Sequence, residues 1–169
     1  MTLGVPEGLI DLVRPWADLY SGSKAIATIV TFAHVGGLLL AGGLAIAADR
    51  VTLRIHGFDA IDGARHLADL ARTHRAVIGG LVVIALSGVL MLTADLETFL
   101  VSPVFWTKMT LVAALLANGY RMTRIERRLR SDEAPRAPIL WKSLRSTAIV
   151  SLALWFAVAF LGVTLVNVA

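Results

Sequence analysis

Four segments of this chain are about 20 residues long and almost entirely apolar, and they constrain the fold more than any other feature. They cover about residues 25–48, 76–94, 103–120 and 148–167, and only the third holds a charged residue, Lys108. An α-helix needs about 20 such residues to cross a bilayer. None of the segments alternates polar and apolar residues, as strands of a membrane barrel do. The sequence therefore predicts a single all-α domain, an integral membrane bundle of four transmembrane helices.

The composition excludes several classes of protein. The chain is 57% hydrophobic and 17% charged, against about 45–50% and about 25% in soluble domains. This balance excludes an ordinary soluble enzyme and a disordered chain. The absence of cysteine excludes disulfides, thiolate chemistry and iron–sulfur clusters. Motifs of nucleophilic or phosphate-binding sites are also missing from the sequence, so whether the protein is an enzyme stays open.

The positions of lysine and arginine predict how the chain is oriented. The connections 49–75 and 121–145 hold thirteen of these residues, whereas the segment before the first span and the connection 95–102 together hold two. Cytoplasmic loops carry such an excess, so we expect both termini outside the cytoplasm, in a bacterial inner membrane. Insertion and anionic lipid account for basic residues at these places. The net charge of +4 therefore gives no reason to expect a nucleic-acid partner.

Two flanking segments have the pattern of amphipathic helices at a membrane interface. Residues 9–18 place apolar side chains at helical spacing among charged ones, and Pro15 predicts a kink or a split there. Residues 58–71 show the same pattern within the first cytoplasmic connection. We expect this second interfacial helix to continue into the second span.

His34 is the only histidine that lies well inside a predicted span, about 13 Å deep at 1.5 Å per residue. A polar residue at that depth indicates either a functional site or a hydrogen bond across helices, for example to Ser87. The other three, His56, His66 and His74, fall in the first cytoplasmic connection. We expect them to be solvated, and His66 and His74 lie too far apart along a helix to share one metal.

Lys108 lies about one turn below the predicted outer surface. Its ammonium either extends to the headgroups or to nearby carboxylates, or it faces the bundle at the level of His34. Two methionines fall in the same layer, because the first and third spans descend while the second ascends. In the second case, one pocket open to the outer leaflet is lined by His34, Met91, Lys108 and Met109.

Paired glycines follow His34 in the first span, at Gly36 and Gly37. Small residues let membrane helices approach closely. They also leave a flat groove beside His34 in which the ring of a porphyrin or a quinone fits. Trp155 in the fourth span either packs against such a cofactor or belongs to the core.

The leading interpretation is a haem b held by His34 as the metal ligand. No other histidine shares its depth, so Lys108 or Met91 would have to complete the coordination.

Two further polar residues in or next to the spans have local explanations. Asp49, at the cytoplasmic end of the first span, is expected to pair with the adjacent Arg50, and Asn118 is expected to bond across helices.

Several short motifs resemble those of an uncharacterised family of bacterial four-helix integral membrane proteins. They are HVGGLLLAGG at 34–43, the pair Ser87 and Gly88, and FWTKM at 105–109. More remotely, an intramembrane His and a Trp-x-Lys opening another helix are similar to CopD-like copper-resistance proteins and HemJ-like protoporphyrinogen oxidases. For the latter, haem ligation by a His and a Lys has been proposed. The resemblance, which covers about residues 30–125, implies His34 and Lys108 as the haem ligands.

Three functions follow as hypotheses. The first is a small redox protein of the cytoplasmic membrane that binds haem b or a quinone. The second is a non-enzymatic membrane subunit or scaffold that packs against a partner. Besides the lipid bilayer, the expected partner is either a second copy of the chain in a homo-oligomer or another membrane protein. The third is copper-resistance-like metal handling or transport, with His34, Met91 and Met109 as soft ligands.

Overall fold

The computed structural model describes residues 6–54, 60–131 and 137–168, and every element in these ranges is an α-helix. This confirms the all-α class. In chain order the helices are α1 (Glu7–Gly22), α2 (Lys24–Arg54), α3 (Ala60–Ala94), α4 (Leu96–Val101), α5 (Pro103–Arg130) and α6 (Ala137–Val168).

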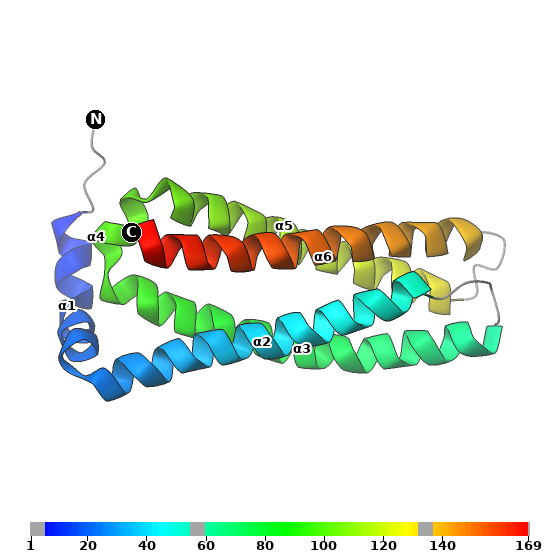
Figure 1. Ribbon diagram of the computed structural model, residues 1–169, viewed down its shortest axis with the longest axis horizontal. Helices are drawn as coiled ribbons and strands as arrows, with labels where there is room; N and C mark the ends of the chain where they lie inside the picture. The colour runs from blue at the N-terminus through cyan, green and yellow to red at the C-terminus, as the bar shows by residue number, and fades with distance from the viewer. Residues whose placement is uncertain (1–5, 55–59, 132–136, 169) are drawn as a thin grey trace.

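The four long helices lie side by side along the bundle, and α1 lies across one end (Figure 1). Helix α2 packs along α3, and α5 packs along α6. The two pairs are joined mainly through α2 and α6, whereas α3 and α5 contact each other at few positions. We call the end that carries α1 and α4 the terminal end. The opposite end, where α5 finishes with Arg127, Arg128 and Arg130, is the arginine-rich end.

Within the described residues, three helical segments are long and apolar enough to cross a membrane: Lys24–Arg54, Arg65–Ala94 and Pro138–Asn167. Their outer faces expose large apolar side chains such as Phe32 and Phe160, which suits contact with lipid. These features support a membrane-embedded protein. Helix α5 does not meet the same requirement, because Lys108 and a run of arginines lower its apolar content. Three helices, rather than the predicted four, therefore qualify by length and composition.

At the start of α5, the sequence predicts a helix N-terminus from Ser102 followed by Pro103, because a capping hydroxyl and a proline at the first helical position favour one. The structure confirms this start. Ser102 accepts a hydrogen bond from the Phe105 backbone N–H at 3.5 Å, and Pro103 occupies the first helical position. The connection before it contains the short helix α4, which the sequence reading did not anticipate. Asp95 caps α4 by accepting from the Thr98 backbone N–H at 3.3 Å.

Both predicted amphipathic segments are helical where they are described. Helix α1 continues through Pro15 and is therefore not split there. It packs on α3 and α2 at the terminal end, where the Trp16 indole N–H donates to the Leu90 carbonyl at 2.8 Å. Helix α3 runs without a break from the amphipathic segment into the apolar one, as expected. Phe58, which begins that segment, lies outside the described residues.

Glycines bring α2 into close contact with helices on two sides. A Cβ atom at Gly80 of α3 would lie 2.8 Å from the Cβ of Ala41, and one at Gly37 would lie 3.0 Å from Ile84. On the α6 side, a Cβ atom at Gly42 would meet the ring of Trp155 at 3.2 Å. These contacts place α2 between α3 and α6, with no room for larger side chains at the crossing points.

Candidate functional site

The His34 ring extends from α2 to α3 and is fixed there by two acceptors. Its Nδ1 lies 3.1 Å from the Ile84 carbonyl oxygen and 3.1 Å from the Ser87 hydroxyl. A carbonyl oxygen only accepts, so Nδ1 carries the proton. Ser87 donates its own hydrogen to the Val83 carbonyl at 2.6 Å, which leaves its oxygen free to accept from His34. The predicted hydrogen bond to Ser87 is confirmed, and in the neutral ring Nε2 keeps its lone pair.

Gly88 makes room for this ring. A Cβ atom at Gly88 would lie 3.2 Å from Cε1 of His34 and 3.6 Å from Nδ1. The missing side chain therefore lets the imidazole lie directly against the backbone of α3. The Ser87–Gly88 pair thus supplies both a hydrogen-bond acceptor and the space for the ring.

Lys108 of α5 is half-buried, and its ammonium lies beside α6. A Cβ atom at Gly162 would be 3.7 Å from Nζ and 3.9 Å from Cε of Lys108. Among the described residues, no carboxylate lies within ion-pair distance of this ammonium. These observations favour the orientation toward the bundle over contact with headgroups. We call His34, Ser87 and Lys108 the histidine–lysine cluster.

The other residues predicted for this site are placed differently. Met91 follows Ser87 by one turn on α3 and is partly buried, as is Met109 on α5. A Cβ atom at Gly36 would meet no atom within 4 Å. Trp155 is 5% exposed and packs on Gly42 in the core. Gly42 lies eight residues beyond His34 on α2, which is about 12 Å along the helix axis.

The cluster can be compared with what a haem requires. Histidines that ligate a metal almost always donate their other ring N–H to a carbonyl, carboxylate or water, and His34 does so to Ile84. The interface between α2 and α3 near Gly37 is closed by Ile84 and Gly80. A planar ring would therefore have to lie on a side of His34 away from this closed interface. The donor set fits one histidine ligand to a haem iron.

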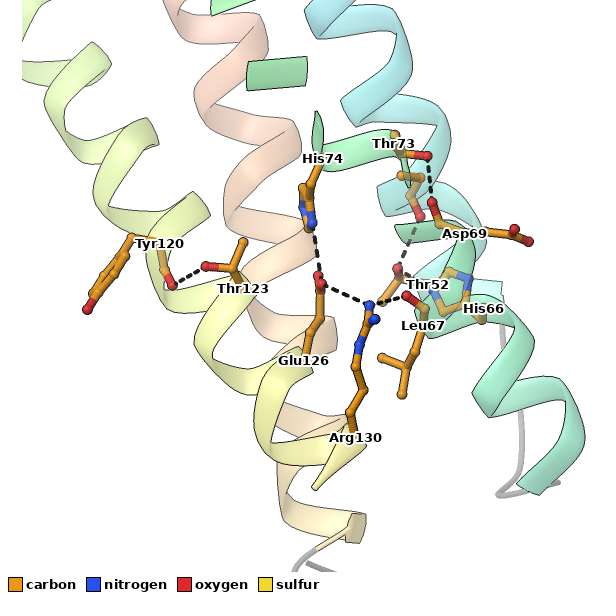
Figure 2. Close-up of polar contacts among 11 residues, drawn as sticks. Thr52, His66, Leu67, Asp69, Thr73, His74, Tyr120, Thr123, Glu126 and Arg130 are labelled. Atoms are coloured by element: carbon orange, nitrogen blue, oxygen red, sulfur yellow. Dashed lines mark hydrogen bonds and ion pairs between the residues drawn. The ribbon is translucent and has the colours of Figure 1, made fainter. Parts of the chain in front are cut away.

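A second polar cluster lies nearer the arginine-rich end, and the sequence reading missed it. Glu126 of α5 is 3% exposed, and its Oε2 lies 3.3 Å from Nδ1 of His74 and 4.0 Å from Nη2 of Arg130. Figure 2 shows the Glu126 side chain between these two groups. Arg130 also donates to the Leu67 carbonyl of α3. Together these contacts join α5 to α3.

Asp49 of α2 belongs to the same cluster and is 2% exposed. Its carboxylate hydrogen-bonds the side chain of Ser151 on α6. Oδ2 of Asp49 and Oε1 of Glu126 are both buried without a hydrogen-bond partner. The predicted ion pair with Arg50 is wrong, because consecutive helical residues face different directions: Arg50 is exposed while Asp49 points into the bundle. We call Asp49, His74 and Glu126 the carboxylate cluster.

The prediction that the histidines of α3 are solvated is wrong. His66 is 7% exposed, donates from Nε2 to the Thr52 hydroxyl at 2.9 Å, and stacks on Trp141. The side chain of His74 is 22% exposed and contacts Glu126. The sequence held a signal for this burial, since the two histidines share one helix face with the buried Leu70. His56 lies outside the described residues.

Glu126 also left a signal in the sequence. It is the one acidic residue in the arginine-rich run 121–130, and an isolated carboxylate among cations is easily taken for part of a solvated surface. Between the two clusters on α5, Asn118 donates from its side-chain amide to the Thr147 carbonyl of α6 at 2.9 Å. The predicted bond of Asn118 across helices is thus confirmed.

No family model, curated protein or solved structure matches this chain. Within the described part of the chain, no group of three or more His, Asp or Glu side chains is arranged to hold a metal ion. The function therefore has to follow from the chemistry of the two clusters.

Proposed function

We propose that this protein is a small redox protein of the bacterial cytoplasmic membrane that binds haem b at the histidine–lysine cluster. One observation carries the proposal: the 3.1 Å contact between Nδ1 of His34 and the Ile84 carbonyl. It fixes the ring and its tautomer and leaves the Nε2 lone pair for a ligand. A half-buried histidine prepared in this way on a membrane helix is a functional site by default.

The proposal includes α5 as a fourth span, with both chain termini outside the cytoplasm. Helix α5 has 28 residues, about 42 Å at 1.5 Å per residue, and it runs alongside α6 through the bundle (Figure 1). Its arginines gather in its last turns, and Lys108 contacts α6. Its apolar middle therefore remains available to lipid and to neighbouring helices. The arginine-rich end would face the cytoplasm.

Each residue of the cluster has a separate role in this proposal. His34 would hold the haem iron through Nε2, while Ile84 and Ser87 keep the imidazole in place. Lys108 would serve either as a second iron ligand, in its neutral amine form, or as an ammonium partner for a propionate. Met91 would be the alternative second ligand. The haem would supply one-electron redox chemistry, and the protein would set its potential through these ligands.

The absorption spectrum of purified protein tests this proposal. Protein produced with added haem should show a Soret band and a pyridine haemochrome of b type. His34→Ala should lose the band, and His66→Ala, in which the histidine bonded to Thr52 is removed, should keep it. A protein that stays colourless although it is folded and monodisperse would contradict haem binding.

A quinone is the second candidate ligand, and the Lys108 ammonium favours it. This ammonium has no carboxylate partner among the described residues, and it can donate hydrogen bonds to a quinone carbonyl. Organic extraction of the purified protein, followed by mass spectrometry, would detect a bound quinone. Lys108→Met keeps the length of the side chain and should reduce the quinone-to-protein ratio at least tenfold.

A non-enzymatic scaffold is favoured by a different observation. The Gly37–Ile84 contact and the His34–Ser87 bond already serve helix packing. Co-purification of a membrane protein partner at fixed stoichiometry would support this function, and a pigmented homo-oligomer would contradict it.

Copper handling would require His34 together with Met91 and Met109 as ligands. Copper that is retained by wild type but lost in Met91→Leu would support this function.

A further inference from the structure

The carboxylate cluster has no role in the function proposed above, although all four long helices contribute to it. Asp49 comes from α2, His74 from α3, Glu126 from α5 and the Ser151 hydroxyl from α6. Asp49 and Glu126 are 2% and 3% exposed. Ionisable side chains buried among membrane helices commonly belong to ion or proton pathways. Their burial therefore calls for a chemical explanation.

Within the described residues, the direct cationic contacts of this cluster go to Glu126 and not to Asp49. His74 and Arg130 both approach the same oxygen of Glu126, at 3.3 and 4.0 Å. Asp49 is 2% exposed, has the Ser151 hydroxyl as its hydrogen-bond partner, and forms no ion pair with a described residue. A buried carboxylate without a direct cationic partner is costly to keep ionised.

The other polar groups around the cluster give Asp49 no direct cationic contact within the described residues. His66 of α3 donates to Thr52, and its charge is influenced by Glu126 and by Asp69. On α6, Ser151 contacts Asp49, and the nearest charged residue in sequence is Arg145, six positions earlier. The charged groups that act on Asp49 are thus His74 and Glu126.

Two carboxylate oxygens in the cluster have no donor. Oδ2 of Asp49 and Oε1 of Glu126 are both buried and unpartnered. A proton on Asp49 would remove one negative charge and turn one unpartnered acceptor into a donor. A metal ion is a poorer occupant, because the described residues include no group of three or more His, Asp or Glu side chains placed to hold one.

We propose that Asp49, His74 and Glu126 form a proton-binding site that takes up one exchangeable proton from the arginine-rich end. The proton adds to the Asp49 carboxylate, forming a carboxylic acid, and the net charge of the cluster rises by one. His74, with a side chain that is 22% exposed, is the most accessible member of the cluster, and it lies near the 40% exposed Arg130 side chain through their shared partner Glu126. This proposal does not depend on a ligand at the histidine–lysine cluster.

Infrared spectroscopy of the full chain in lipid nanodiscs tests the site directly. At about pH 6, exposed carboxyl groups are ionised, so the carbonyl stretch of a protonated carboxylic acid reports a buried one. Wild type should show this band, and the band should shift in deuterated buffer and disappear as the pH is raised. Asp49→Asn should remove it. Asp69→Asn, which changes an exposed aspartate on α3, should keep it.

Two further variants should move the midpoint of this titration in opposite directions. Ser151→Ala removes a hydrogen bond to the ionised Asp49, so the acid should persist to higher pH. Glu126→Gln removes the neighbouring negative charge, so the band should disappear at lower pH. These shifts do not depend on the Asp49→Asn variant and remain measurable if that variant fails to fold.

Three results would overturn the proposal. The first is the same band in Asp49→Asn, which would place the acid elsewhere. The second is the absence of a protonated acid in wild type at every pH at which the protein stays folded. The third is loss of the band on addition of sodium chloride at constant pH, which would identify an alkali cation as the ligand.

Discussion

The two polar clusters of this bundle satisfy their buried groups in different ways. In the histidine–lysine cluster, His34 is held by a backbone carbonyl and a hydroxyl of the adjacent helix. In the carboxylate cluster, Glu126 relies on side chains that are themselves ionisable, and one oxygen each of Asp49 and Glu126 stays without a partner. The first arrangement fixes a ring in one orientation. The second leaves Asp49 without a direct cationic contact among the described residues, and a proton can neutralise this carboxylate.

The clusters also differ in which helices they join. The His34 bonds stay within the closely packed pair α2 and α3. The contacts of Glu126 and Arg130 instead cross from α5 to α3, where the two helix pairs otherwise meet at few positions. Disturbing the first cluster should therefore have local effects, and disturbing the second should loosen one pair from the other.

The largest effect is expected at Gly80, where an added Cβ atom would make the shortest contact among the described glycines. Gly80→Leu would force α3 away from Ala41, because even a Cβ atom would come within 2.8 Å. Overpacking of this kind costs about 3 kcal/mol at the upper end of the usual range. The change should lower the free energy of unfolding in mixed micelles and disturb both clusters together.

The adjacent glycine provides a matched control for this change. A Cβ atom at Gly79 would meet no atom within 4 Å, so Gly79→Leu should leave the unfolding curve within about 0.5 kcal/mol of wild type. Equal destabilisation by the two variants would contradict the close approach of α2 and α3 at Gly80.

The next largest effect should come from His74, which would test the link between the helix pairs. His74→Leu leaves the buried Glu126 with only the more distant Arg130, at a cost of about 2 kcal/mol for a buried charge that loses its partner. Arg72→Leu is the control, since it breaks an exposed pair with Asp69 worth less than about 1 kcal/mol. Similar losses of unfolding free energy in both would refute a special role for His74.

The difference between the clusters also explains which structural features could be predicted from the sequence. The apolar segments and the cap at Ser102 predict helices from local pattern alone, and the Ser102 cap is observed. The His34–Ser87 bond was also predictable, because both residues lie in uncharged spans that neighbour each other in the chain. These features depend on short-range pattern or on adjacent helices.

The carboxylate cluster depends on contacts that local pattern does not contain. His74 lies on α3 and Glu126 lies on α5, and these two helices belong to different close pairs. Asp49 stands beside Arg50, and only the helix rotation decides that the aspartate faces inward. The position of α1 across the bundle likewise depends on its packing against α3 and α2, which includes the long-range hydrogen bond from Trp16 to the Leu90 carbonyl. Contacts of this kind can be predicted only when it is known which helix faces pack against each other.

A smaller effect is expected at the histidine–lysine cluster. Ser87→Ala removes one of the two acceptors of His34 but leaves the Ile84 carbonyl in place, so the loss should be about 0.6 kcal/mol, typical of hydrogen bonds between membrane helices. Thr110→Ala, which removes only a bond of a helical hydroxyl to its own backbone, should cost less. A loss from Ser87→Ala as large as that from His74→Leu would show that the clusters are equally sensitive.

The smallest effect should appear at α1, which lies on the terminal end only. Trp16→Phe removes the indole bond to the Leu90 carbonyl, worth about 0.5 kcal/mol. Hydrogen exchange should therefore speed up in α1 while the amides around Glu126 keep their protection. Trp106→Phe removes a similar indole bond, to the Leu100 carbonyl, and should leave exchange in α1 unchanged. If Trp16→Phe also weakened protection around Glu126, the two ends of the bundle would be coupled, and the contacts of α1 at the terminal end would not be local in their effect.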